Sequence, residues 1–228
     1  MNKVTTVFQP FSKKQKKVLT WWLPESPVSH CSGIIADGAI RSGKTLSMSL
    51  SFVIWAMHCF ASKNFAMCGK TINSFRRNVL FSLKTMLEAR GYLLEEHRTE
   101  NRIVIKRNSI TNYFYIFGGK DERSQDLIQG ITLAGIFFDE VALMPESFVN
   151  QATGRCSENG SKFWFNCNPE GPLHWFKVNW IDQKACGEKE LYYLHFTMND
   201  NTALSEEIKK RYQNMYAGVF YLRYVLGK

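Results

Sequence analysis

The segment Gly33–Ser49 reads GIIADGAIRSGKTLSMS, and it changes character twice along its length. A short β-branched run is followed by a glycine-bounded polar loop, after which the chain turns apolar again. Residues Gly38–Thr45 (GAIRSGKT) match the G-x-x-x-x-G-K-[ST] phosphate loop at every required position. In such a loop the backbone N–H groups point at phosphate oxygens, and the following helix adds the positive end of its dipole. The segment therefore predicts a strand–loop–helix unit that binds a nucleoside triphosphate.

The side chains of this loop have separate expected roles. Lys44 should reach the β- and γ-phosphates, and the Thr45 hydroxyl should hold Mg²⁺. Arg41 also lies inside the loop. The predicted nucleotide-binding residues of the loop are Gly38, Ala39, Ile40, Arg41, Ser42, Gly43, Lys44 and Thr45.

A second motif lies in the stretch GIFFDEVALMP, residues 135–145. An apolar run that ends in a carboxylate is the expected partner of a phosphate loop, and it would place Asp139 beside Mg²⁺. Glu140 follows directly and is suited to orient and activate the attacking water. An exposed Asp-Glu pair that caps the next turn is the alternative. With a complete phosphate loop upstream, the two carboxylates favour hydrolysis over transfer to a small acceptor.

Two further segments contain polar or aromatic candidates. SKFWFNCNP reads as a strand that ends at Asn168-Pro169, and strand tips in open α/β sheets face the ligand crevice. Asn168 could sense the γ-phosphate, or it could simply start the turn. Near the N-terminus, Phe8 and Phe11 could stack on a base while Gln15 hydrogen-bonds to an adenine edge.

Composition limits the other possibilities. The chain has 228 residues, 45% of them hydrophobic and 21% charged, with a net charge of +9. A basic balance suits a polyanionic partner, although it is weak evidence alone. The six cysteines form no C-x-x-C pair, and Cys156, Cys167, His174 and Cys186 have irregular spacing, which argues against a zinc module or a disulfide framework. We expect no signal peptide, no membrane span and a cytoplasmic protein.

The order of elements predicts the fold class. Strands are expected near 33–37 and 64–69 and helices near 44–60 and 74–90, and this alternation favours parallel strands with crossover helices. A strand pair joined by a turn at 107–109, then strands at AGIFFDE and SKFWFNCNP, should complete the sheet. The tail from residue 204 reads as one or two helices broken at Gly218. It ends abruptly, which suggests a domain cut from something longer.

In these motifs the chain resembles the ATPase domain of a large terminase subunit, the DNA-packaging motor of tailed bacteriophages. The resemblance rests on FSKKQKKVLTWW, ADGAIRSGKT, IQGITLAGIFFDEVALMP, NCNPEGPLHWFK and the tail DNTALSEEIKKRYQNMYAGVFYLRYVLGK, which together span nearly the whole chain. It implies a RecA-like P-loop NTPase fold of the additional-strand, catalytic-glutamate class, a mostly parallel sheet flanked by helices, with a small lid subdomain. The expected segments are an adenine-side lead-in at 1–30, a P-loop ATPase core at 31–195 and a helical lid segment at 196–228.

The resemblance also assigns roles by position. It implies that Gln15 reads adenine, that Thr45 and Asp139 hold the metal, that Glu140 is catalytic together with Lys44 and Arg41, and that Asn168 sits in a coupling motif. An arginine is common in the family at the position of Arg41, where it could touch the γ-phosphate; a salt bridge at the edge of the loop is the alternative. Family motors use an arginine from a neighbouring subunit, for which Arg123 and Arg155 are the candidates, although a solvated loop arginine is the ordinary interpretation of each.

The implied cofactors are ATP and Mg²⁺. The implied partners are double-stranded DNA, a small terminase subunit and the portal of the procapsid. The active form would be a homo-oligomeric ring, with the isolated domain monomeric. The implied location is the cytoplasm of an infected bacterial host, transiently at the portal. Large terminases usually carry a C-terminal nuclease domain, and no acidic cluster here suits one, so we expect no nuclease activity in these residues.

Three alternatives remain at this point. A helicase or other nucleic-acid translocase would use the same two motifs. This sequence does not show the arginine-rich motifs and second RecA-like domain expected of that group. A P-loop phosphotransferase and a nucleotide-gated binding module are both disfavoured by Glu140 directly after Asp139.

Overall fold

The computed structural model describes residues 9–185 and 190–228, and in them eight strands form a single sheet. The strand order is β3-β4-β5-β2-β6-β7-β1-β8. The pairs among β5, β2, β6, β7, β1 and β8 are parallel, whereas β3–β4 and β4–β5 are antiparallel. The strands are β1 (Gly33–Gly38), β2 (Asn64–Gly69), β3 (Leu93–His97), β4 (Arg102–Arg107), β5 (Ile110–Gly118), β6 (Gly135–Asp139), β7 (Lys162–Asn166) and β8 (Leu191–Phe196).

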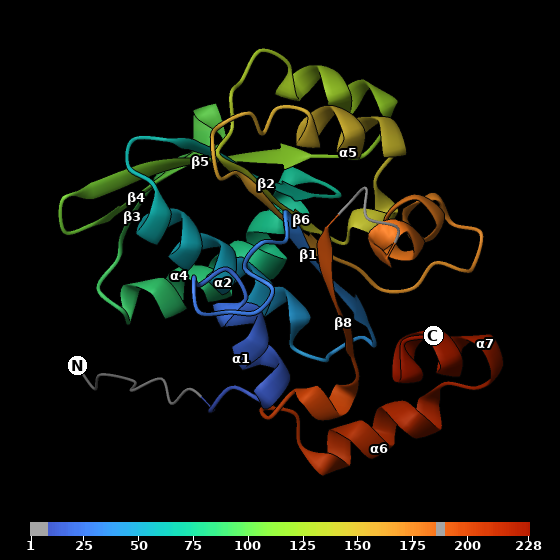
Figure 1. Cartoon of the computed structure of the whole chain (residues 1–228). Coiled ribbons are helices and arrows are strands. Elements are labelled where there is room, and N and C mark those ends of the chain that lie inside the picture. The colour runs from blue at the N-terminus through green and yellow to red at the C-terminus, as the bar shows by residue number, and fades with distance from the viewer. Residues whose placement is uncertain (1–8, 186–189) are drawn as a thin grey trace.

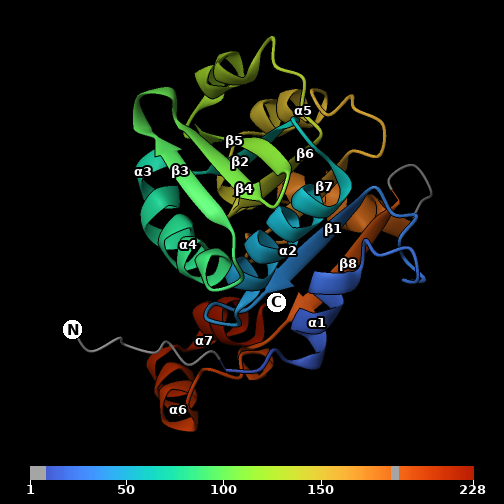
Figure 2. The ribbon, with the colours of Figure 1, turned by 90° about the vertical axis from the view of Figure 1, so that its left-hand side faces the viewer.

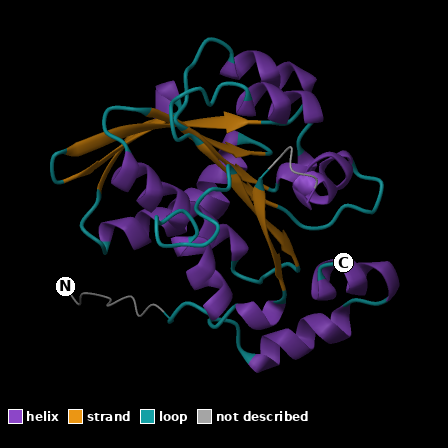
Figure 3. Ribbon diagram, viewed as in Figure 1, coloured by secondary structure: helices purple, strands orange, loops and turns teal. Residues whose placement is uncertain are grey.

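Helices cover both faces of this sheet (Figures 1 and 3). The α-helices are α1 (Lys13–Thr20), α2 (Lys44–Cys59), α3 (Ile72–Phe75), α4 (Phe81–Glu88), α5 (Glu146–Thr153), α6 (Glu206–Met215) and α7 (Gly218–Phe220). The π-helical segments are η1 (Arg76–Leu80), η5 (Lys177–Ile181) and η8 (Tyr221–Leu226). The 3₁₀ turns are η2 (Arg98–Glu100), η3 (Glu122–Ile128), η4 (Val141–Leu143), η6 (Asp182–Ala185) and η7 (Met198–Asp200). No helix in the described ranges has the length and apolarity needed to cross a bilayer.

The core is divided by the sheet, because successive strand residues point to opposite faces. In β1, Ile34 packs with α1, α2 and α4, whereas Ile35 packs with α5 and the segment around Trp180. Both clusters are rich in aromatic side chains. Phe52 of α2 lies within 6.1 Å, between ring centroids, of five other aromatic rings. Burial on both faces explains why the central strands read as continuous apolar runs.

Most of the expected elements are confirmed with boundary shifts of a residue or two. β7 lies between β1 and β6, which is the additional strand expected between the two nucleotide motifs. One boundary was wrong, because the strand predicted to end at Asn168-Pro169 ends at Asn166. The helix predicted near 74–90 begins at Ile72 and passes through η1.

The patterns in the sequence did not predict α1, α5, β3 or β8. Their positions matter because β8 is the second neighbour of β1, and α1 packs on α2. Figures 1 and 2 both show α6 and α7 beside the end of β8, near α1. Lys14 of α1 forms an ion pair with Asp200 at 2.8 Å, and Thr202 donates to the carbonyl of Pro10, so α1 and the residues before it contact the segment that precedes α6. The proposed division at 30/31 and 195/196 stays a prediction.

Candidate nucleotide-binding site

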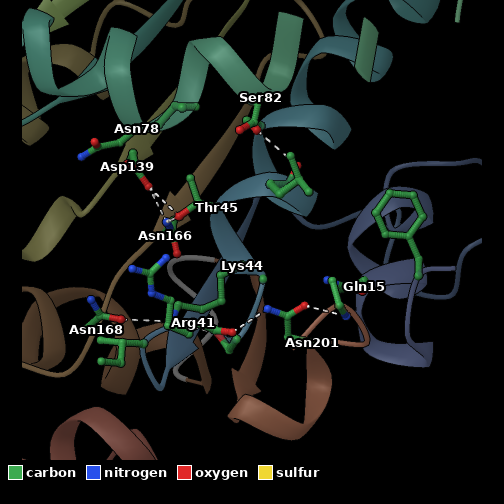
Figure 4. Close-up of a pocket in the computed structure, with 18 of the residues that line it drawn as sticks. Gln15, Arg41, Lys44, Thr45, Asn78, Ser82, Asp139, Asn166, Asn168 and Asn201 are labelled. Carbon is green, nitrogen blue, oxygen red and sulfur yellow. Dashed lines mark hydrogen bonds between the residues drawn. The ribbon is translucent and has the colours of Figure 1, made fainter. Parts of the chain in front are cut away.

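A cleft of about 780 Å³ opens at the carboxyl ends of β1, β6 and β7 (Figure 4). Parallel strands bring their carboxyl ends to one edge of a sheet, so the loops after these strands converge there. The cleft collects residues from the phosphate loop, the end of β6, the loop after β7, η1, α4 and the segment after η7. Its polar lining includes Gln15, Arg41, Ser42, Lys44, Thr45, Asn78, Ser82, Asp139, Glu140, Asn166, Asn168 and Asn201.

The phosphate loop has the backbone that its glycines permit. Gly38 has φ 134° and Gly43 has φ 80°, both in the region that favours glycine. A Cβ on Gly38 would lie 2.0 Å from the Phe196 carbonyl oxygen, and one on Gly43 would lie 2.5 Å from Gln15 Nε2. The two glycines therefore allow close approach by β8 on one side and by α1 on the other.

Lys44 is buried and folded back onto its own loop. Its Nζ donates to the carbonyl oxygens of Gly38 at 2.9 Å and Ala39 at 2.6 Å. It also donates to Asn168 Oδ1 at 3.1 Å. Burial lowers the pKa of the Lys44 ammonium to about 8, although nearby acidic groups act in the opposite direction. A polyanion in the cleft would place further negative charge beside this buried ammonium and favour its charged form.

Thr45, Asp139 and Asn166 form a connected cluster at the centre of the cleft. Thr45 Oγ1 donates to Asp139 Oδ1 at 3.2 Å, and the Asn166 amide nitrogen donates to Thr45 Oγ1 at 2.9 Å and to Asp139 Oδ1. Asn166 Oδ1 is buried and has no hydrogen-bond partner among the described residues. Burial raises the pKa of Asp139 to about 6, while the Asn166 and Thr45 hydrogen bonds oppose the rise.

This oxygen-rich cluster fits a divalent cation. Mg²⁺ is typically held by one or two protein carboxylate or hydroxyl ligands together with phosphate oxygens and water. Thr45 and Asp139 supply such a pair, and the unpartnered Asn166 oxygen lies beside it. The described residues contain no group of three or more His, Cys, Asp or Glu side chains that could hold a metal alone.

Glu140 follows β6 and lines the same cleft. Its backbone has φ 57° and ψ 46°, a left-handed conformation that costs an L-residue about 1–2 kcal/mol. Such strained residues persist only where the surrounding structure holds them in place, and they cluster at functional sites. Here the strain turns the chain directly after Asp139 and leaves the half-buried Glu140 side chain at the cleft.

Helices α1 and α4 also contribute to the cleft, with Gln15 and Met86 among its lining residues. Gln15 is buried, and its Oε1 accepts from the Ser12 N–H at 2.9 Å in a helix capping box. Because that N–H binds an oxygen, the Gln15 nitrogen is the end left to face the cleft. Phe11, Leu46, Val79 and Met86 supply apolar lining. Phe8 lies outside the described residues.

The remaining predicted residues differ in position. Arg41 and Asn168 both line the cleft, and Arg41 has φ 56° with its carbonyl accepting from Asn201 Nδ2 at 2.7 Å. Arg123 and Arg155 do not line it. Arg123 is exposed in η3, and Arg155 lies beside the start of β6, at the opposite edge of the sheet from Asp139. A role for either in a neighbouring subunit's site stays a prediction.

Several lining residues escaped the sequence analysis. Asn166 is one of them, and its signal was the Asn-Cys-Asn spacing, which puts two amides on the same side of an extended chain. Asn78 lies in the π-helical η1, a local geometry often found at functional sites, and Ser82 lies one turn later (Figure 4). No sequence pattern distinguished Asn78 and Ser82 from ordinary surface positions.

The model of the phage terminase large subunit family matches residues 32–225. Among solved structures, the large terminase of a thermophilic bacteriophage has a TM-score of 0.93 and 64% identity over 96% of this chain and 54% of that chain. The same thermophilic-phage protein in complex with ATP-γ-S has a TM-score of 0.90 and 62% identity over 96% of this chain and 53% of that chain.

A more distant match is the large terminase ATPase domain of Thermus phage P74-26, with a TM-score of 0.60 and 14% identity over 94% of this chain and 97% of that chain. At that identity the likeness supports the fold alone. No curated protein matches the chain. The chain spans about half the length of the thermophilic-phage large terminase, with 54% of that chain covered.

Proposed function

Because this chain belongs to the phage terminase large subunit family, we propose that it is the ATP-hydrolysing domain of a motor that moves double-stranded viral DNA into a procapsid. One observation carries the proposal. Lys44, Thr45, Asp139 and Glu140 lie in one cleft, so a phosphate-binding ammonium, a pair of metal-binding oxygens and a candidate base all face the same space. That combination suits hydrolysis of the terminal phosphate.

Nucleotide binding has the most direct support. The thermophilic-phage large terminase, 62% identical over most of this chain, was solved in complex with ADP and with ATP-γ-S. We assign the triphosphate to the phosphate loop Gly38–Thr45 and the base to the side of the cleft formed by Gln15 and Phe11. Gln15 Nε2 would donate to an acceptor on the adenine edge, while its oxygen stays bound to Ser12.

Nucleotide must first free Lys44. In the structure its ammonium donates to two loop carbonyls, the Ser42 hydroxyl and Asn168, and phosphate oxygens would replace these neutral acceptors. Exchange of neutral acceptors for charged ones strengthens each hydrogen bond. Asn168 would then lose this partner and could donate its amide to the γ-phosphate, as the proposed coupling role requires.

The chemical step needs a base and a charge-stabilising environment. Glu140 would accept a proton from the attacking water, and Lys44 together with Arg41 would stabilise charge on the phosphate. Thr45 and Asp139 would hold Mg²⁺, which neutralises phosphate charge when bound. Asn166 orients both of these ligands through its amide.

The partners follow from the family. We propose double-stranded DNA as the translocated substrate, with a small terminase subunit and a portal-bearing procapsid as assembly partners. The working form would be a ring of copies, active in the cytoplasm of an infected bacterium. The net charge of +9 is compatible with a polyanionic substrate.

A DNA-dependent ATPase assay with two variants tests the proposal. Lys44→Ala should abolish productive ATP binding. Glu140→Gln should retain ATP binding and slow hydrolysis by roughly two to four orders of magnitude, the range for a lost general base. Hydrolysis near the wild-type rate in Glu140→Gln would refute the assignment. Strand separation by the wild type would point to a helicase, and phosphate transfer to a small acceptor would point to a phosphotransferase.

A further inference from the structure

The C-terminal turn, defined here as Tyr221–Gly227, lies directly against the first half of the phosphate loop. The Ile40 N–H donates to the Tyr224 carbonyl at 3.1 Å. Gly227 has φ 69°, and a Cβ on it would lie 2.4 Å from the Ala39 nitrogen and 2.6 Å from the Gly38 Cα. The turn therefore approaches the loop backbone so closely that only glycine fits at position 227.

Side-chain packing reinforces this contact. Ala39 and Val225 are both buried in one small cluster, together with Met198. Ile40, Tyr221 and Leu226 are partly buried around it, among others. Ala39 and Ile40 occupy positions of the phosphate-loop motif that any residue can fill, and here they form an apolar contact with the turn.

The same turn also reaches the loop that follows β7. Arg223 forms an ion pair with Glu170, and both side chains are largely shielded from solvent. Glu170 is two residues beyond Asn168, whose Oδ1 accepts from Lys44 Nζ. The C-terminal turn thus contacts the two loops that enclose the phosphate site, although none of Tyr221–Gly227 lines the cleft itself.

The backbone N–H groups of the phosphate loop show what the contacts with the C-terminal turn do. The Ala39 N–H donates to the Phe196 carbonyl at 2.9 Å, and the Ile40 N–H donates to Tyr224. Since each N–H is a single donor, these two are already used, and only those after Ile40 remain for phosphate. The first half of the loop is an anchored arm, and its position determines where the second half points.

We propose that the C-terminal turn is a positioning element for nucleotide binding, with Gly227 and Val225 as positioning residues that set the curvature of the phosphate loop. The inference rests on the proposed nucleotide-binding function and adds residues outside the cleft to it. Displacement of the turn would move the anchored arm and misplace the phosphate-facing N–H groups. Each hydrogen bond to a charged group is worth about 1.5–3 kcal/mol, so loss of one would weaken binding about 10- to 100-fold.

Two glycines, Gly227 in the C-terminal turn and Gly218 shortly before it, provide a matched test. Gly227→Ala and Gly218→Ala both force an alanine into a left-handed backbone, with φ 69° and φ 55°. A Cβ at Gly218 meets nothing within 4 Å, whereas at Gly227 it meets the phosphate loop. We expect Gly227→Ala to raise the Kd of a fluorescent ADP analogue about 10- to 100-fold. Gly218→Ala should bind as the wild type does, although both variants lose some thermal stability.

A second pair decides the matter if Gly227→Ala does not fold. Val225→Ala removes two methyl groups from the cluster that holds Ala39, and Leu222→Ala changes a side chain of the same turn that is 46% exposed. Val225→Ala should raise the nucleotide Kd more than Leu222→Ala does, at a temperature where both are folded. Equal Kd values within each pair would overturn the inference, provided the wild type binds nucleotide. A wild-type protein that binds none would instead refute the proposed function.

Discussion

Replacing Asn166 with alanine should weaken the binding of Mg²⁺ together with nucleotide more than it weakens the binding of nucleotide alone. The Asn166 amide donates to Thr45 Oγ1 at 2.9 Å and to Asp139 Oδ1, the two oxygens that we assign to the metal. Without it, both ligands lose the group that fixes their orientation. The Lys44 ammonium keeps all its hydrogen bonds, because none of them is made to Asn166.

The size of the effect follows from the geometry. Outer partners of metal ligands typically contribute about 10- to 100-fold to metal affinity, and Asn166 supports two ligands at once. The variant should also respond to pH. The pKa of Asp139 is about 6, and the Asn166 hydrogen bond holds it down against burial. Loss of that bond raises the pKa further, so protons compete with Mg²⁺ from a higher pH, and the deficit should be larger at pH 6 than at pH 8.

The assay is a Mg²⁺ titration of nucleotide binding and of ATP hydrolysis at both pH values. Asn168→Ala is the matched control, because Asn168 contacts Lys44 and makes no hydrogen bond to Asp139. Its half-saturating Mg²⁺ concentration should equal that of the wild type. If Asn166→Ala showed the same half-saturating concentration as this control at both pH values, the assignment of Asn166 to the metal site would be wrong.

Two other predictions concern pH and assembly. Burial alone would raise the pKa of Asp200, but hydrogen bonds from Lys14 and Thr197 lower it overall. The stabilisation from these hydrogen bonds is therefore present above the ordinary pKa of 3.8 and is lost as the pH falls through the lowered pKa. Asp200→Asn should therefore melt below the wild type at pH 6, with the gap closing at more acidic pH; a constant gap would contradict this. If Arg123 or Arg155 acts on a neighbouring copy, specific ATPase activity should rise with protein concentration, because such an arginine is worth about 10³–10⁵ in rate. Activity that does not change on dilution would count against both.

The phosphate loop and Asp139 could be predicted because their signals are local. Each needs only a short apolar strand followed by a fixed residue pattern, and the parallel sheet then brings the strand ends together. For the same reason, Asn168 could be placed at the edge of the sheet where the carboxyl ends of the strands meet. The order of β7 between β1 and β6 came from the family resemblance rather than from any pattern in the strands themselves.

Other elements lacked a local signal. Strand β3 (LLEEH) lies at the sheet edge and is mostly exposed, so it shows no apolar alternation. Helix α1 is strongly basic, and only its Ser12-x-x-Gln15 capping box marked its start. The sequence did not show that Asn166, as well as Asn168, lines the cleft, because that depends on where the strand ends. The contacts of Gly227 with the phosphate loop depend on tertiary approach, which no spacing in the sequence encodes.

The placement of β1 has a consequence for the order of events during synthesis. Its two neighbours, β7 and β8, come from the later part of the chain. The Lys44–Asn168 contact at the site joins residues 124 positions apart, and the Asp37–Tyr193 contact between β1 and β8 joins residues 156 positions apart. Contacts that close such long loops form slowly, whereas the β3–β4–β5 meander is local. A chain emerging from the ribosome could assemble that meander early, but β1 would have no paired neighbour until β7 had been made. The capacity to bind nucleotide should therefore be among the last properties that the growing polypeptide acquires.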